Sequence, residues 1–146
     1  MKKFLSVMIY CVCVFFLTVS ISYAASPDDV LGVWQNHKSM QEEKAAQITI
    51  YKCGEKYCGK YTGMKNPDQI DENNKDEAKR GRKLMGSDLI YGVEYDDDGE
   101  YEDGKIYSAE KGKEFTCNME LKNADELYIE GCMAFLCGGT TWHRIK

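Results

Sequence analysis

The chain has 146 residues, which suits one globular domain and is too short for two. Its formal net charge is −5. Without Lys2 and Lys3 the 19 basic residues fall to 17 against 24 acidic ones, so the charge becomes −7. A charge of this sign disfavours nucleic acid or an anionic lipid as the partner of the protein.

The first 24 residues have the features of a secretory signal peptide. Lys2 and Lys3 precede an apolar run at residues 4–19, and Ser22-Tyr23-Ala24 forms a small-residue exit that suits cleavage. The run of about 16 residues is shorter than the roughly 20 that span a bilayer as a helix. We therefore expect cleavage near Ala24, a single domain over residues 25–146 with no membrane span, and a periplasmic or secreted location.

Five cysteines follow the predicted cleavage site, and four of them form two C-x4-C pairs, Cys53 with Cys58 and Cys132 with Cys137. Four intervening residues make a hairpin loop, and the facing positions at its neck lie within disulfide range. In an exported protein each pair predicts a disulfide that staples one hairpin. Export also argues against the alternative, a four-thiolate zinc site, so we expect no metal.

Cys117 is the remaining thiol, and the sequence leaves its state open. If Ala124-Asp125 is a two-residue turn, Cys117 faces Cys132, and a bridge between them would leave Cys137 free. The interpretation that we prefer is a buried, unpaired Cys117.

The dominant period after residue 25 is two, which indicates strands with one buried face. Eight strands are expected, at residues 32–36, 47–51, 57–64, 89–93, 100–108, 113–122, 126–132 and 140–145. The turn signals that separate them include Asn36-His37, Gly54-Glu55, Asp98-Gly99, Lys111-Gly112 and Gly138-Gly139. Short strands at this spacing predict an all-β fold, and eight of them suit an antiparallel up-and-down barrel.

Residues 66–82 interrupt the period-two pattern with a polar and charged segment. Residues 75–80 permit a helix, so we expect one long loop that carries one to two helical turns. Long ordered loops often bind partners, although a solvated crossover is the simpler interpretation.

The interior of an eight-stranded barrel is either filled by side chains or holds one small ligand. Tyrosine predominates among the aromatic residues, and tyrosine walls favour a pocket with hydrogen-bonding groups. Alternation assigns several side chains to the interior and predicts a pocket lined by Ile48, Ile50, Leu89, Tyr91, Met119 and Leu127.

The two ends of the domain carry a second pattern. Gly32-Val33-Trp34 stands in the first strand, and Thr141-Trp142-His143-Arg144 stands in the last, which is its neighbour if the barrel closes. This pattern resembles the calycins, in which a late arginine covers an early tryptophan at the closed end of a lipocalin-like barrel. The resemblance predicts that Arg144 lies over Trp34 within about 6 Å of the ring, a favourable cation–π contact.

Almost the whole domain also resembles the bacterial family called domain of unknown function 2147 (DUF2147). The matching stretches are Gly32-Val33-Trp34, Ile48-x-Ile50-Tyr51-x-Cys53, Tyr57-Cys58-Gly59-Lys60, Asp71-x-Asn73-Asn74 with Arg80-x-Arg82 and Gly86, Gly104-Lys105-Ile106-Tyr107, Lys111-Gly112-Lys113, Leu127-x-x-x-Gly131-Cys132 and Thr141-Trp142-x-Arg144. The family is exported and calycin-like with no established activity, so the resemblance implies architecture and location only.

Catalytic patterns are weak in this sequence. His37 and His143 are the two histidines, and a lone strand histidine is more often structural than catalytic. The acidic residues 94–100 lack an apolar setting that would raise a carboxyl pKa, and as a calcium loop they would place Lys105 at the twelfth position. We therefore expect no catalytic residue and no cofactor.

The function favoured by the sequence is an exported barrel that binds a small apolar or amphiphilic molecule. The alternative is an envelope interaction or structural module with a solid core, whose surface, such as the loop at residues 66–82, contacts another protein. The presence of an interior cavity would discriminate the two. The oligomeric state is not indicated.

Overall fold

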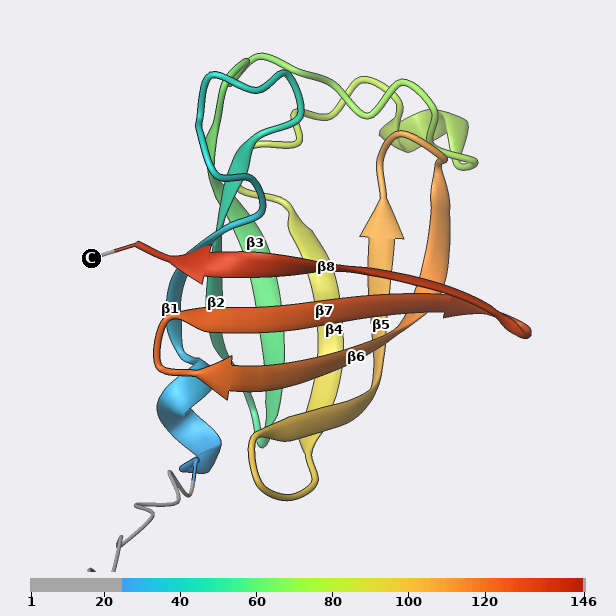
Figure 1. Ribbon diagram of the computed structural model, residues 1–146. Coiled ribbons are helices and arrows are strands. Elements are labelled where there is room, and N and C mark those ends of the chain that lie inside the picture. Colours follow the sequence, from blue (N-terminus) through green and yellow to red (C-terminus); the bar gives the residue numbers. More distant parts are fainter. Residues whose placement is uncertain (1–24, 146) are drawn as a thin grey trace, which may run out of the picture.

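Eight antiparallel strands follow one another around a closed barrel in the computed structural model, which describes residues 25–145 (Figure 1). The strands are β1 (Gly32–Gln35), β2 (Ala46–Cys53), β3 (Lys56–Met64), β4 (Asp88–Tyr95), β5 (Glu100–Ser108), β6 (Lys113–Asn123), β7 (Glu126–Met133) and β8 (Leu136–Arg144). Each strand pairs with the next in the chain, and β8 pairs with β1. The predicted up-and-down barrel is therefore confirmed. The signal peptide predicted for residues 1–24 lies outside the described residues.

The barrel has two unlike ends. The β2–β3, β4–β5 and β6–β7 turns lie at one end, which we call the closed end. The other four connections lie at the opposite end, which we call the loop end. The loop end carries the long β3–β4 loop, residues 65–87, which Figure 1 shows above the strands. Its only helix is one 3-10 turn, η2 (Glu77–Lys79), shorter than the one to two turns expected, and Asp76 caps it through the amide of Ala78.

The last hairpin departs from the predicted turn. The glycine pair Gly138-Gly139 lies inside β8, which begins at Leu136, and the turn instead uses Ala134 and Phe135. Ala134 adopts a φ of 56°, so the chain reverses there without a glycine. The prediction was wrong because a glycine pair favours a turn locally, whereas here the two glycines continue a strand pairing.

The closed end is covered by a segment that the sequence analysis missed, the 3-10 helix η1 (Pro27–Val30). Figure 1 shows it at the lower left, where the chain enters β1. Val30 is fully buried in the core, and the indole N–H of Trp34 donates to the Val30 carbonyl at 2.8 Å. Tyr57 donates to the Asp28 carboxylate and Tyr101 to the Pro27 carbonyl, both at 2.9 Å. The hydroxyl groups of two tyrosines thus hold η1 against the closed end of the barrel.

Arg144 completes this closure. Its guanidinium carbon lies 4.1 Å from the centroid of the Trp34 ring, which confirms the predicted stacking. The same guanidinium donates hydrogen bonds to the carbonyls of Leu31, Asp29 and Ala124. One side chain therefore joins β8, the segment before β1 and the β6–β7 turn.

Both predicted disulfides are present, Cys53–Cys58 and Cys132–Cys137, and Cys117 is buried and free. The rival bridge to Cys132 does not form because the register between β6 and β7 shifts after Leu121. Cys117 consequently faces Gly131, and Thr116 takes the place opposite Cys132.

Candidate functional site: the barrel mouth

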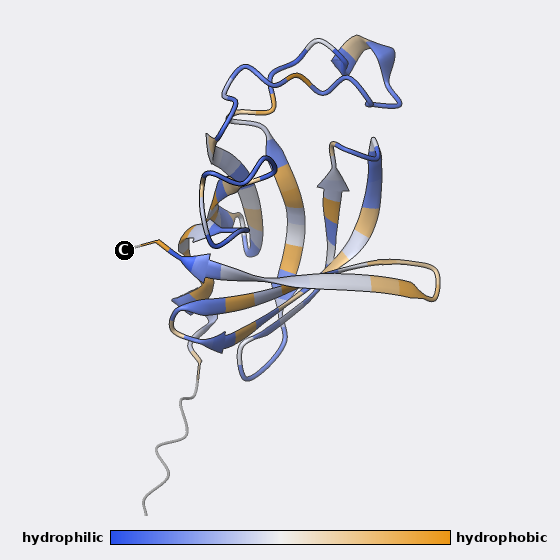
Figure 2. Ribbon diagram, turned by 45° about the horizontal axis from the view of Figure 1, so that its top comes forward, coloured by the Kyte–Doolittle hydropathy of each residue, from blue (hydrophilic) through white to orange (hydrophobic). Residues whose placement is uncertain are grey.

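Five of the six residues predicted to line a pocket lie together in one packed cluster. Ile48, Ile50, Leu89, Met119 and Leu127 are at most 5% exposed. They pack with large buried side chains of the same core that include Trp34, Tyr101 and Trp142. Figure 2 shows these apolar stretches recurring along the strands. These five side chains belong to the packed core of the barrel interior rather than to the wall of an open interior pocket.

Tyr91, the sixth residue, lies elsewhere. The register between β3 and β4 shifts at Gly59, which pairs with Ile90. On the other side of β4, Ile90 pairs with Ile106 and Tyr91 pairs with Lys105 of β5. Because directly paired residues share a face of the sheet, Tyr91 stands on the face opposite to Ile90. A β-bulge thus breaks the alternation that predicted Leu89 and Tyr91 on one inner face.

Above the packed core, the inner face of the last hairpin is open. The pairs Leu127–Trp142, Ile129–Thr140, Gly131–Gly138 and Met133–Leu136 succeed one another along β7 and β8 at intervals of two, so all share the core face. The first pair is buried, yet Met133 is 47% and Leu136 is 68% exposed, and Gly138 and Thr140 are exposed as well. We call this surface, Gly131, Met133, Leu136, Gly138 and Thr140, the barrel mouth.

Two features of the backbone keep the mouth open. Gly131 and Gly138 face each other without side chains, and a Cβ atom placed on Gly138 would meet no atom within 4 Å. In addition, β1 is short and pairs with β8 only at Arg144 and His143, so the loop-end part of β8 has β7 as its only strand neighbour among the described residues. The result is an open trough on the inner face of β7 and β8.

The far wall of the trough is apolar. A Cβ atom placed on Gly131 would lie 3.4 Å from Ile106 Cγ2 and 3.5 Å from Phe115 Cβ, in ordinary contact. Ile106 and Phe115 face each other across β5 and β6 and are both half-buried. Apolar side chains from β5, β6, β7 and β8 therefore surround a strip of bare backbone.

At the lower edge of the mouth stands Trp142, next to Thr140 on the same face of β8. It is 3% exposed, and its Nε1 is the one buried side-chain nitrogen or oxygen without a hydrogen-bond partner in residues 25–145. An unpaired buried donor costs about 1–3 kcal/mol, so such groups mark places where an acceptor is expected. The other indole, that of Trp34, is satisfied by Val30.

A polar cavity adjoins the mouth beneath the β3–β4 loop. Its volume is about 450 Å³, and Met133 belongs to both the cavity and the mouth. The lining is rich in charged and aromatic side chains, namely Lys75, Asp76, Lys79, Arg82, Tyr91, Tyr107, Lys113 and Glu114, with Asn74, Gly112 and Met133. Tyr91, separated from the other predicted residues, contributes to this cavity.

Asp71 anchors the loop over the cavity. Its fully buried carboxylate accepts hydrogen bonds from Tyr107 at 2.6 Å, Asn74 at 2.7 Å and Arg82 at 3.0 Å. Burial opposes ionisation, but these hydrogen bonds outweigh it and hold the pKa of Asp71 below its usual value. Burial and the bond to Asp71 raise the pKa of Tyr107 to about 12. Three residues of the loop motif, Asp71, Asn74 and Arg82, thus serve to fold the loop.

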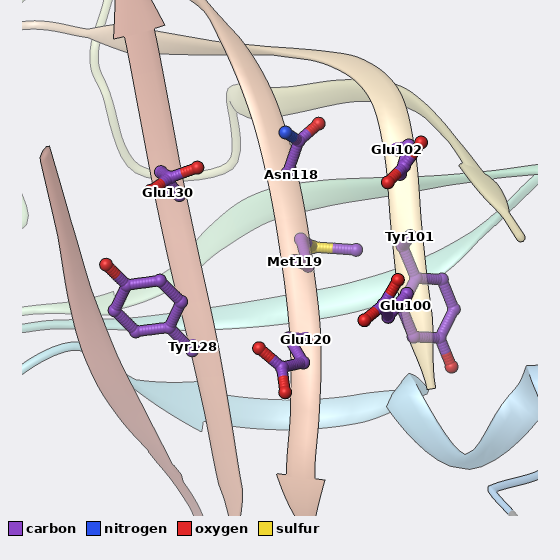
Figure 3. A pocket seen from close by; sticks show the side chains of 8 residues that line it. All are labelled: Glu100, Tyr101, Glu102, Asn118, Met119, Glu120, Tyr128 and Glu130. Carbon is purple, nitrogen blue, oxygen red and sulfur yellow. The ribbon is translucent and has the colours of Figure 1, made fainter. Parts of the chain in front are cut away.

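A second hollow, of about 230 Å³, lies across β5, β6 and β7 and is acidic (Figure 3). Glu100, Glu102, Glu120 and Glu130 surround Met119 there. The carboxylates of Asp96, Glu100 and Glu102 gather within 4.8 Å of one another but are exposed, as solvated acidic groups commonly are.

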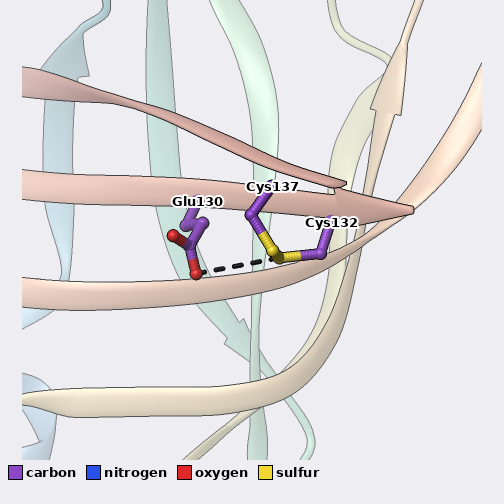
Figure 4. Close-up of side chains that lie close together, drawn as sticks. All are labelled: Glu130, Cys132 and Cys137. Carbon is purple, nitrogen blue, oxygen red and sulfur yellow. Dashed lines mark hydrogen bonds between the residues drawn. A yellow bond between two sulfur atoms is a disulfide. The ribbon is translucent and has the colours of Figure 1, made fainter. Parts of the chain in front are cut away.

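Glu130 also lies beside the hairpin disulfide, with an oxygen 3.8 Å from Cys132 Sγ (Figure 4). Both sulfurs are used in the Cys132–Cys137 bond, so they cannot act as thiolate ligands for a metal. His37, one of the two histidines, contacts Glu42 at 2.9 Å in the exposed β1–β2 loop. No described helix is long and apolar enough to cross a membrane.

Comparison with known proteins places this barrel in a family. Among solved structures, protein HP1028 from the human pathogen Helicobacter pylori, which belongs to the lipocalin family, superposes with a TM-score of 0.71. The match covers 80% of this chain and 83% of that one at 16% identity, so the likeness is one of fold alone. The curated proteins contain no match. Residues 32–144 match the model of the family described as uncharacterized protein conserved in bacteria (DUF2147), and the chain therefore belongs to that family.

Proposed function

We propose that this protein is an exported binding protein that holds a small, partly apolar molecule in the barrel mouth. The observation that carries the proposal is the contrast between the two ends. The closed end is sealed by η1, Trp34 and Arg144. At the loop end, Met133 and Leu136 are exposed, although they stand on the same face of β7 and β8 that is buried nearer the closed end. Apolar inner surface is costly to leave in water, so a ligand that covers it gains affinity.

The lining indicates the chemistry of such a ligand. Met133, Leu136 and Phe115 offer apolar contact, and the bare strip at Gly131 and Gly138 admits a flat or slender body. The unpaired N–H of Trp142 favours a molecule with one oxygen acceptor at its inner end. An amphiphilic molecule meets both demands. It would rest on the packed core, above Ile129 and Trp142, rather than among Ile48, Ile50 and Leu127.

Substitution of Gly138 by tryptophan tests the site directly. The new side chain would fill the trough, and its backbone conformation is ordinary, so the barrel should fold. The probe is N-phenyl-1-naphthylamine, an uncharged dye that fluoresces in apolar surroundings. We expect saturable fluorescence enhancement with the native protein and at least a tenfold weaker affinity with Gly138→Trp.

Gly81→Trp is the matched control, because a Cβ atom at Gly81 also meets nothing within 4 Å but lies on the β3–β4 loop. Equal affinity in Gly138→Trp and Gly81→Trp would place the dye outside the mouth. If the native protein does not bind the dye, and no compound in a screen of amphiphiles raises its melting temperature, the binding proposal fails. A bound ligand at 100 times its dissociation constant adds about 2.7 kcal/mol of stability.

That negative result would favour the second candidate, an envelope interaction or structural module. The packing of five predicted pocket residues into a solid core is the observation that supports it. We propose binding rather than catalysis under either candidate, because the residues of the barrel mouth, Gly131, Met133, Leu136, Gly138 and Thr140, carry no side chain that could act as a general acid or base near neutral pH.

Export, with residues 25–146 as one mature domain in the periplasm or outside the cell, is part of the proposal and rests on the signal-like sequence and on the two disulfides. Counting thiols tests it. Mature protein has one free thiol, Cys117, which is buried and has its pKa raised by burial to about 12. We expect no alkylation in the folded state and one label per chain in urea. Three labels would mean that Cys11 and Cys13 remain.

A further inference from the structure

We infer that the loop end docks on an anionic lipid bilayer, with the tip of the β7–β8 hairpin inserted among the lipids. We define the hairpin tip as residues 133–136. It contains three of the large hydrophobic side chains that the described chain exposes, Phe135 at 89%, Leu136 at 68% and Met133 at 47%. Figures 1 and 2 show this hairpin projecting beyond the other strands, with its apolar residues at the extremity.

The tip is held in one shape. Cys132–Cys137 closes its neck, with Cα atoms 4.1 Å apart, and leaves four residues in the loop. A constrained loop loses little conformational entropy when it inserts into a bilayer, so less of the free energy gained by apolar burial is offset and the affinity is higher. Phe135 is 89% exposed, so its ring is not buried in the core, and a large apolar side chain held in water at a constrained tip indicates a surface that meets an apolar partner.

Basic side chains stand next to the tip. Met133 shares one cavity with Lys75, Lys79, Arg82 and Lys113, so these basic residues lie beside the hairpin and outnumber the acidic residues of the same cavity, Asp76 and Glu114. Lys75 and Lys113 have no ion-pair partner among residues 25–145. Lys111 lies over the Phe115 ring, 5.3 Å from its centroid. An apolar tip flanked by exposed basic residues is the arrangement that inserts into the membrane interface and pairs with lipid phosphates.

The charge of the whole chain conceals this patch. Residues 36–45, 65–87 and 109–112, the other three connections at the loop end, carry nine Lys and Arg against eight Asp and Glu, whereas the full chain is −5. The excess negative charge therefore lies on the barrel wall and at the closed end, as in the acidic hollow of Figure 3. A bilayer with anionic lipid would orient the molecule with its loop end toward the membrane.

A bilayer fits this surface better than a protein partner does. The apolar area is one narrow hairpin tip, while a stable protein interface covers about 800 Å² on each side. Docking in this orientation also turns the barrel mouth toward the lipids. If the mouth binds amphiphiles, as the proposed function states, its ligand would exchange directly with the membrane; only this last step rests on that proposal.

Co-sedimentation with phospholipid vesicles tests docking. Mature protein should bind vesicles that contain phosphatidylglycerol, bind vesicles of pure phosphatidylcholine far less, and dissociate as salt is raised. Phe135→Ser should weaken partitioning about tenfold, and Lys113→Gln about fivefold. The matched controls, Ile145→Ser and Lys122→Gln, remove an exposed apolar side chain and an amine away from the tip and should bind like the native protein.

Absence of binding to phosphatidylglycerol vesicles, or equal binding by Phe135→Ser and Ile145→Ser, would overturn the inference. So would a native protein that self-associates through Phe135 without binding vesicles, since the tip would then be a protein contact. Dye binding by Phe135→Ser in solution keeps the two proposals apart. Loss of vesicle binding by this variant with its dye binding intact is the expected result. Native protein that binds the dye but no vesicles contradicts docking alone, and native protein that binds vesicles but no dye contradicts the ligand site alone.

Discussion

Replacing Arg144 by alanine should lower the free energy of unfolding by about 3 kcal/mol, which is a large effect for a domain of this size. The substitution removes the stack on Trp34 and three hydrogen bonds to backbone carbonyls. One of those carbonyls lies in η1 and one just after it, so the substitution should also loosen η1 at the closed end. Equilibrium unfolding in urea with both disulfides intact measures the change.

Arg144→Lys separates charge from geometry in this test. A lysine keeps the positive charge but has neither a planar group for the ring nor a fork of donors. We expect it to recover less than half of the lost stability. Destabilisation of the alanine variant by less than 0.5 kcal/mol, a rough threshold for ordinary surface changes, would show that Arg144 does not hold the closed end.

Replacing Asp71 by asparagine should also cost about 3 kcal/mol, because it leaves Arg82 and Tyr107 facing an amide in place of a buried carboxylate. The loss should appear first in the β3–β4 loop. Amide hydrogen exchange at Leu84, which bonds to the Gln69 carbonyl within the loop, reports that local opening. Tyr107→Phe removes a single hydrogen bond and should cost about 1–2 kcal/mol.

The effect of Asp71 should depend on pH in a defined direction. The pKa of Asp71 is lower in the folded protein than its usual value, so ionised Asp71 stabilises the fold above the unfolded pKa of about 4. That contribution is lost as the pH falls through the folded pKa. The stability gap between native protein and Asp71→Asn should thus be full at pH 7 and shrink below about pH 4. An unchanged gap would contradict the assignment.

Features fixed by local pattern were predictable from the sequence. Period-two alternation identified all eight strands, and C-x4-C spacing identified both disulfides, because each pattern follows from strand geometry at a hairpin neck. The stack of Arg144 on Trp34 followed from family resemblance, since nothing local joins residues at opposite ends of the chain.

The candidate site was not predictable in the same way. The bulge that turns Tyr91 to the outer face depends on the pairing between β3 and β4, which the sequence of one strand does not reveal. Gly138 suggested a turn, yet it forms the bare floor of the mouth because the reversal occurs at Ala134 and Phe135. The sequence signal for the site is that two apolar residues, Met133 and Leu136, flank the turn, and the structure exposes both.

The net charge of the chain does not predict the charge at one surface. The net negative charge argues against anionic lipid as a partner of the chain as a whole, but charge at a surface depends on which loops meet there. Lys75 and Lys113 are distant in sequence and meet only because the β3–β4 loop crosses the end of β6. The fold of that loop depends in turn on Asp71. Its role was not predictable from the sequence, because its partners Asn74, Arg82 and Tyr107 meet only in the folded structure.

The most direct test of the binding mouth is the indole N–H signal of each tryptophan in a ¹⁵N-labelled sample titrated with N-phenyl-1-naphthylamine. The protein has two tryptophans, so the spectrum contains its own control. The Trp142 signal, from the unpaired donor below the mouth, should shift progressively with dye, while the Trp34 signal, bonded to Val30 at the closed end, should stay fixed. A titration in which Trp34 moves and Trp142 does not, or in which neither moves at saturating dye, would contradict a binding site in the barrel mouth.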